Sequence, residues 1–123
     1  MTPEEMKRRT KAFAVGMVKV LDGIARGRAG DVIVRQAIRS STSVAANYRA
    51  ACLARSKAEF NAKLQIALEE ADESQLWLEI LSEAGLDEGV RFSALHQEAR
   101  ELTAIFMASL KTSRGIPCPL NFQ

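Results

Sequence analysis

Residues 39–60 read RSSTSVAANYRAACLARSKAEF, a run of small and hydroxyl side chains that leads into an asparagine. Three interpretations fit such a run: a flexible linker, a reactive serine site, or a helix that a neighbour approaches closely. The apolar residues Val44, Tyr48 and Cys52 follow one another at steps of four, the spacing of one helical face. The stretch is therefore predicted to be the second half of a helix, whose small residues serve close packing.

Capping signals divide the rest of the chain into helices. Thr2-Pro3-Glu4-Glu5 is a start signal, and in the capping box at Ser56 the side chain of Glu59 is expected to reach back to the cap. Asp31 is a plausible cap for a second helix. We expect helices at about residues 3–26, 32–54, 57–84 and 88–113, the third and fourth ended by Gly85 and Gly115, and an extended or disordered tail at 115–123.

Four helices joined by short connections predict an all-α fold, an antiparallel up-down-up-down four-helix bundle of one domain over residues 1–114. An apolar content of 47% is that of a globular protein. The charged start MTPEEMKRRTK is no secretory signal, and no apolar run reaches the roughly 20 residues that span a bilayer. We therefore expect a cytoplasmic protein without a membrane partner.

The sequence offers no catalytic or metal-binding pattern. The single histidine, His96, follows Ser93 rather than a glutamate at the third position before it, so no di-iron Glu-x-x-His motif exists. Ser40, Ser41 and Ser43 have no His or Lys one helical turn away to activate them. Phosphate-binding glycine loops are also missing. We expect no enzyme, no cofactor, no metal and no small-molecule substrate, with Cys52 in the core and Cys118 in the tail as free thiols.

Charge is distributed unevenly along the chain. Residues 59–90 hold nine Asp or Glu against one Lys, whereas residues 1–30 hold seven Lys or Arg against three Asp or Glu. Such opposite blocks can form complementary surfaces within one chain or between copies, or can simply be solvated helix faces. A basic stripe can also follow the phosphates of a nucleic acid. The candidate nucleic-acid contacts are Lys7, Arg8, Arg9, Lys11, Arg28, Arg35 and Arg39.

A second set of residues is expected to specify packing or assembly. Ile66, Trp77 and Ile80 widen the apolar stripe of the third helix beyond what one core needs. Trp77 either anchors an interface or rounds off the core. Asn47 can bond to Ser43, to backbone across the bundle or to another subunit, and a buried asparagine often specifies register. The candidate oligomer or packing residues are Ser43, Asn47, Tyr48, Trp77 and Ile80.

Residues 35–81, RQAIRSSTSVAANYRAACLARSKAEFNAKLQIALEEADESQLWLEIL, carry a motif of some length. Its elements are Arg35-Gln36, Arg39-Ser40, Ser43-Val44-x-x-Asn47, Arg55-Ser56-x-x-Glu59-Phe60, and an acidic helix that ends in Trp77-Leu78. The pattern resembles the bacterial four-helix bundle family of 23S ribosomal RNA intervening-sequence proteins. Many members have Glu-Gly where this chain has Ala50-Ala51.

The resemblance implies a homo-oligomer, in known relatives a five-fold ring, that has no established activity and no catalytic residues. Some relatives resemble the accessory protein of diversity-generating retroelements, which binds a reverse transcriptase and nucleic acid. Two functions are therefore expected: a non-enzymatic self-assembling interaction or scaffold protein, or an RNA- or DNA-binding accessory protein. In the first, we expect Asn47→Ala to change assembly or stability.

Overall fold

A computed structural model describes residues 1–24, 26–86 and 89–115. They form four helices, α1 (Pro3–Asp22), α2 (Arg28–Cys52), α3 (Lys57–Glu83) and α4 (Val90–Ser113), and no strand occurs among these residues. The predicted all-α, four-helix fold is confirmed.

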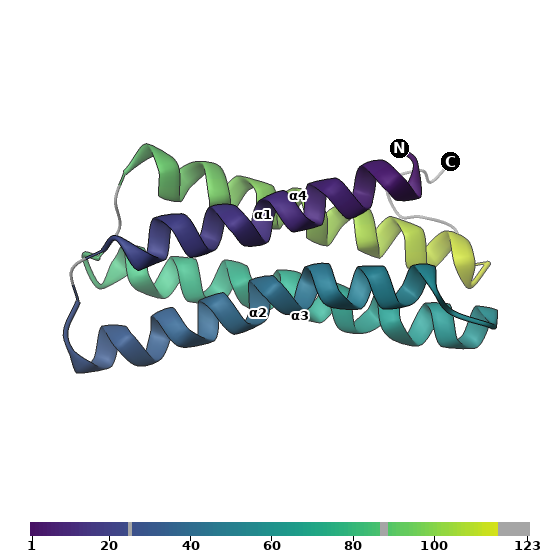
Figure 1. The fold of residues 1–123 in the computed structure, drawn as a ribbon, viewed down its shortest axis with the longest axis horizontal. Coiled ribbons are helices and arrows are strands. Elements are labelled where there is room, and N and C mark those ends of the chain that lie inside the picture. Colours follow the sequence, from purple (N-terminus) through teal and green to yellow (C-terminus); the bar gives the residue numbers. More distant parts are fainter. Residues whose placement is uncertain (25, 87–88, 116–123) are drawn as a thin grey trace.

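The helices lie side by side, and each runs back along the one before it (Figure 1). Asn61, near the start of α3, accepts a hydrogen bond from Ser113 at the end of α4, and Glu79, near the end of α3, meets His96 in the first half of α4. Contacts join α1 with α2, α2 with α3, α3 with α4 and α4 with α1. The pairs α1/α3 and α2/α4 are therefore the diagonals of the bundle, and the outer faces of α1 and α3 point in opposite directions.

The core draws on all four helices. Its largest fully buried side chains include Met17, Leu64 and Phe106, and the ring of Tyr48 stacks on that of Phe106 with 6.0 Å between centroids. Burial is the largest cause that raises the pKa of Tyr48 to about 12. Tyr48, predicted as a packing residue, thus packs inside the bundle.

Ser40, a small residue of the opening stretch, lies where α2 meets α3. Ser40, Ser41 and Val44 are completely buried. The hydroxyls of Ser40 and Ser74 are 2.9 Å apart across this junction, so one donates to the other. The accepting hydroxyl keeps its own proton for a carbonyl of its own helix, that of Ala37 for Ser40 or that of Glu70 for Ser74. Small side chains let the two backbones approach closely, and the hydroxyls find partners without water.

The turn between α1 and α2 differs from the prediction. The first helix ends at Asp22 rather than near residue 26, and the second begins at Arg28 rather than 32. Gly27, in an extended conformation, is the N-cap instead of Asp31. The Asp31 carboxylate lies in the first turn of α2 and accepts a 2.6 Å hydrogen bond from the Arg26 guanidinium. The Asp31 carboxylate is therefore engaged by Arg26, and α2 has no side-chain cap.

The other capping predictions agree more closely with the structure. Thr2 and Glu5 form the expected capping box. Ser56 caps α3 by accepting from the Glu59 N–H, but the Glu59 carboxylate accepts from the N–H of Arg55, one residue before the predicted partner. Gly85 ends α3 with a φ of +82° in a conformation that favours glycine.

The fourth helix begins at Val90, after Gly89 at a φ of +78°, and Gly115 follows its end at +75°. The predictions for Asp87, Glu88, Cys118 and the tail beyond Gly115 lie outside the described residues. No helix in the described ranges is sufficiently long and apolar to span a membrane.

Candidate functional site

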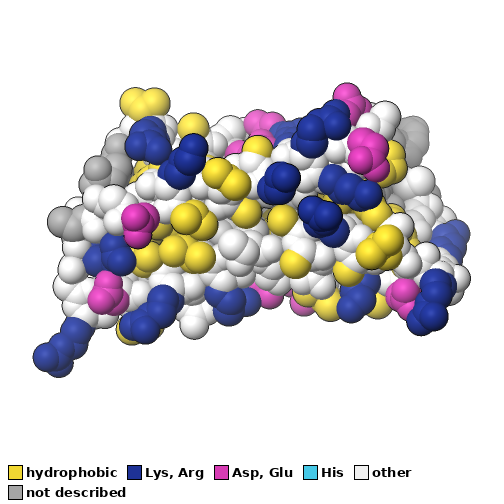
Figure 2. All heavy atoms as spheres, viewed as in Figure 1, with side chains coloured by type: hydrophobic (Ala, Val, Ile, Leu, Met, Phe, Trp, Pro, Cys, Tyr) yellow, Lys and Arg dark blue, Asp and Glu magenta, His cyan; other side chains and the backbone are white. Residues whose placement is uncertain are grey.

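The face formed by α1 and α2 is basic. Figure 2 shows Lys and Arg side chains over both helices, with few Asp or Glu among them and apolar side chains in between. Six cations on these two helices are exposed and make no ion pair within the described residues: Arg8, Lys11, Lys19, Arg28, Arg35 and Arg49. Four of them, Arg8, Lys11, Arg28 and Arg35, are among the predicted nucleic-acid contacts.

Two of the predicted contacts instead form ion pairs with other helices of the same chain. Arg9 donates to Glu98 at 2.7 and 2.8 Å and to Glu101 at 2.7 Å, and these hydrogen bonds, Glu98 first, raise its pKa. Arg39 forms ion pairs with Glu70 and Glu73 on α3, and the hydrogen bond to Glu70 is the main cause that raises its pKa. Arg9 thus joins α1 to α4, and Arg39 joins α2 to α3.

The remaining cations gather most densely where α1 begins and α2 ends. Lys7, Arg8, Lys11 and Arg49 surround an open depression of about 220 Å³ together with Glu4, which pairs with Lys7 at 3.2 Å. Arg49 was not among the predicted contacts. Because α2 runs back alongside α1, Arg49 near its end reaches the depression at the start of α1. The capping signals and the short turn between the two helices were the sequence features from which this position could have been predicted.

The outer face of α3 mixes acidic and apolar side chains. Ile66, Leu76 and Ile80 are 37%, 47% and 36% exposed. Exposed acidic side chains between and beyond them are Glu69, Asp72, Glu79 and Glu83. The predicted widening of the apolar stripe on this helix is present, and Ile80 belongs to it.

Trp77 is half-buried on α3. Its ring packs against the core, and its indole N–H donates to the Glu73 carboxylate at 3.0 Å. The exposed apolar surface of α3 therefore comes mainly from its neighbours, Leu76 and Ile80. The role of Trp77 as an interface anchor stays a prediction.

An apolar groove of about 490 Å³ lies between the start of α2 and the end of α3. The residues that line it include Gly30, Val32, Ile33, Ile80 and Leu86. A Cβ at Gly30 would lie 2.8 Å from Cβ of Arg26, so the turn needs glycine there. The groove continues the exposed apolar stripe of α3 through Ile80.

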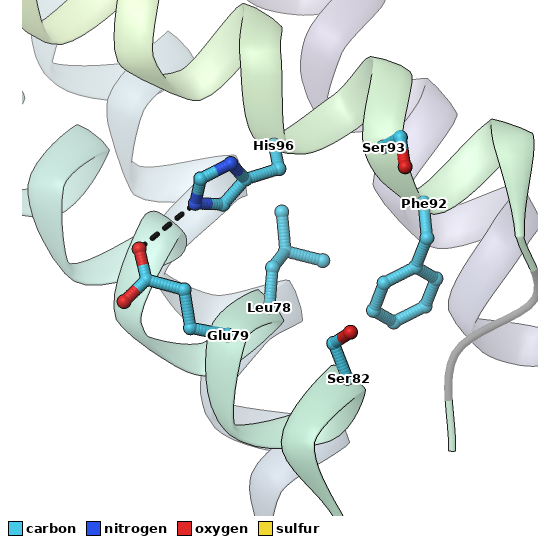
Figure 3. A pocket seen from close by; sticks show the side chains of 6 residues that line it. All are labelled: Leu78, Glu79, Ser82, Phe92, Ser93 and His96. Atoms are coloured by element: carbon cyan, nitrogen blue, oxygen red, sulfur yellow. Dashed lines mark hydrogen bonds and ion pairs between the residues drawn. The ribbon is translucent and has the colours of Figure 1, made fainter. Parts of the chain in front are cut away.

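A smaller polar pocket of about 190 Å³ lies between α3 and α4 (Figure 3). The Nε2 atom of His96 is 2.8 Å from the Glu79 carboxylate, so a base with an orienting acid is present. The Ser93 side chain lies on the preceding turn of α4 and points away from the imidazole (Figure 3). No group of three or more His, Cys, Asp or Glu side chains within the described ranges could hold a metal ion.

Comparison with known proteins identifies the family. The model of the 23S rRNA-intervening sequence proteins matches residues 5–108. The chain belongs to this family. A crystal structure of a protein with unknown function from the S23 ribosomal protein family of Bacteroides thetaiotaomicron is similar, with 31% identity, a TM-score of 0.81 and coverage of 90% of this chain and 99% of the other. Among curated proteins, none matches.

In this member of the 23S rRNA-intervening sequence protein family, the signature at Ser43 and Asn47 forms a polar chain across the α2/α3 junction. The Asn47 side-chain amide donates to the carbonyl and the hydroxyl of Ser43 at 3.0 and 2.9 Å. The Ser43 hydroxyl in turn lies 3.4 Å from the Glu70 carboxylate. Of the partners considered for Asn47, Ser43 is the one to which it is hydrogen-bonded in the structure.

Proposed function

We propose that this protein is a non-catalytic interaction module that assembles with copies of itself into a ring. One observation carries the proposal: the diagonal helices α1 and α3 present surfaces of opposite charge on opposite sides of one bundle. The cations Arg8, Lys11 and Lys19 on α1 have no ion-pair partner within the described residues. A neighbouring α3 offers the carboxylates that could pair with them.

Apolar side chains on both surfaces support the same contact. Val15 and Val18 are 45% and 41% exposed on α1, between Lys11 and Lys19. On α3, Leu76 and Ile80 are exposed in a comparable position among acidic residues. Apolar residues with a charged rim are the usual anatomy of a protein interface.

A contact between two different surfaces of one chain repeats from copy to copy. It closes into a ring when the rotation between neighbours is a whole-number fraction of 360°. For the five copies that the family resemblance implies, this rotation is about 72°. Lys11 lies beside Arg49, so the unpaired cations of α1 extend toward the α2 side of this helix. We propose a pentamer, the number of copies that the family resemblance implies.

Mass measurement in solution tests the proposal. Light scattering and native mass spectrometry at micromolar concentration should give an oligomer at low salt that weakens as salt rises, since exposed charges are screened. Reversal of Arg8 and Lys11 to glutamate should shift the mass toward the monomer. Reversal of the exposed Arg91 and Arg100 on α4 is the matched control, with the same change in net charge, and should leave the mass unchanged. A monomeric wild-type protein at low salt would contradict the proposal.

The cluster at the start of α1 favours a second candidate function, the binding of RNA or DNA, with or without a reverse transcriptase as partner. Lys7, Arg8, Lys11 and Arg49 converge on one depression, and Arg28 and Arg35 extend the basic surface along α2. Phosphate contacts of this kind have a strong salt dependence.

A mobility-shift titration against structured RNA at several salt concentrations tests this candidate. Arg49→Ala should weaken binding and lower the salt slope by about one. Arg39→Gln should have little effect, because the Arg39 guanidinium is already paired with Glu70 and Glu73. The absence of any binding at low salt would eliminate nucleic-acid binding and leave the assembly proposal intact.

A further inference from the structure

We infer that α1 of one copy packs in parallel against α3 of a second copy in one register, with Arg8 opposite Glu69, Val15 opposite Leu76 and Lys19 opposite Ile80. The inference rests on the proposed assembly and specifies its partner surface residue by residue. It concerns the two outer stripes of diagonal helices, which no contact inside the bundle covers.

The two stripes share one spacing. Arg8, Val15 and Lys19 are seven and four residues apart, so they lie on one face of α1. Glu69, Leu76 and Ile80 repeat the same steps on α3. All six residues are exposed. When the helices lie in parallel, one register matches all three positions at once.

Contacts through α4 place the stripes at similar heights along the bundle. A Cβ on Gly16 would lie 3.1 Å from the Leu95 side chain, and the next residue on α4, His96, bonds to Glu79. Gly16 of α1 is thus nearly level with Glu79 of α3. Copies related by rotation about an axis along the bundle meet at equal heights, so Val15 faces residues close to Glu79.

Contacts through α2 give a second estimate of which residues of α1 and α3 lie at the same height along the bundle. Arg8 lies beside Arg49, and Ser43, six residues earlier on α2, lies beside Glu70. Six residues of helix are about 9 Å, so Arg8 is level with a point about six residues before Glu70. Val15 then faces a point near Ala71. The two estimates bracket Leu76.

Charge selects this register over its neighbours. A shift by one turn toward the end of α3 would place Arg8 opposite Glu73, which already pairs with Arg39 and accepts from the Trp77 indole. A shift by one turn the other way would place Arg8 opposite Gln65, which carries no charge, and would lose the charge pair. In the inferred register Arg8 meets Glu69, which pairs with no Lys or Arg among the described residues.

A charge swap tests the register. Arg8→Glu alone and Glu69→Arg alone should each raise the protein concentration needed for assembly about tenfold, the effect of one lost charge pair. The double variant restores an opposite pair at every interface and should assemble like the wild type. The control double variant, Arg8→Glu with Glu83→Arg, changes the same net charge on the same stripe and should remain defective.

Cysteine cross-linking provides the second measurement. In a chain with Cys52→Ala and Cys118→Ser, Val15→Cys mixed with Leu76→Cys should give a disulfide-linked dimer on mild oxidation, and Val15→Cys mixed with Ile66→Cys should not. If the wild type is oligomeric but the charge swap does not restore assembly and this cross-link does not form, the inferred register is wrong and the proposed assembly stands. A monomeric wild type would instead overturn the assembly itself.

Discussion

The junction between α2 and α3 and the junction between α1 and α4 are built in different ways. The first is the most extensive helix contact of the bundle, with the buried residues Ser40 and Ser74 bonded across it. The second is the least extensive, and Arg9 crosses it at the surface to reach Glu98 and Glu101.

The difference has an energetic consequence. Close-packed small residues leave no room, so added volume strains the backbone, whereas a loose junction can take up a methyl group. Surface ion pairs contribute little and are screened by salt. We therefore expect stability to depend mainly on α2/α3. Unfolding experiments must keep the protein concentration constant, because assembly also stabilises the folded chain.

The largest expected effect comes from added volume at the tight junction. Ser40→Leu should lower the free energy of unfolding by about 3 kcal/mol, because the larger side chain has no space against Ser74 and loses its hydrogen bond. Denaturant titration measures this change. Thr42→Leu, two residues away on the exposed face of α2, is the control and should change stability little. Equal effects at the two positions would mean that α2 and α3 are not closely packed.

Loss of the hydrogen bond alone should cost less. Ser40→Ala keeps the volume small and removes the contact to Ser74, whose hydroxyl still donates to the Glu70 carbonyl at 2.9 Å. We expect a loss of about 1 kcal/mol in the free energy of unfolding, the ordinary value of one hydrogen bond. A loss as large as that of Ser40→Leu would show that the bond, and not the volume, controls this junction.

At the loose junction, an added methyl group should stabilise. Gly16→Ala introduces a Cβ 3.1 Å from the flexible end of Leu95, which can move, and alanine favours the helix. The midpoint of thermal unfolding should rise, with a gain of about 0.5–1 kcal/mol. Gly30→Ala is the contrasting variant, since its Cβ would lie 2.8 Å from the Cβ of Arg26, and it should destabilise. If Gly16→Ala destabilises as well, α1 and α4 are packed more tightly than their contact indicates.

The smallest effect is expected from the ion pairs of Arg9. Arg9→Gln should cost about 0.5 kcal/mol at low salt and less at high salt. Glu101 adds a pH dependence, because hydrogen bonds from Gln97 and then Arg9 hold its pKa below the ordinary value of 4.5. The stabilisation is present above that value and is lost as the pH falls through the lowered pKa. Arg9→Gln should reduce this acid sensitivity in denaturant titrations at graded pH; an unchanged pH profile would assign the sensitivity to other carboxylates.

Much of the fold could be read directly from local patterns. Periodic apolar residues and the caps at Thr2 and Ser56 predict four helices, and Gly85 ends the third as expected. The turn before α2 could not be predicted in the same way. Asp31 looks like a cap, but the folded turn brings Arg26 to its carboxylate, and an extended Gly27 caps the helix instead.

The candidate surfaces likewise combine features that the sequence predicts with features that depend on how the helices pack. The order of residues is enough to predict a basic first half, an acidic segment at residues 59–90, and surplus apolar residues on the third helix. The packing of the helices was needed to find that Arg9 and Arg39 pair with carboxylates of their own chain, that Arg49 joins Lys7 and Arg8, and that α1 and α3 face opposite ways. Periodicity encodes which face of a helix is buried, whereas the neighbour of each exposed charge depends on how the helices pack around one another.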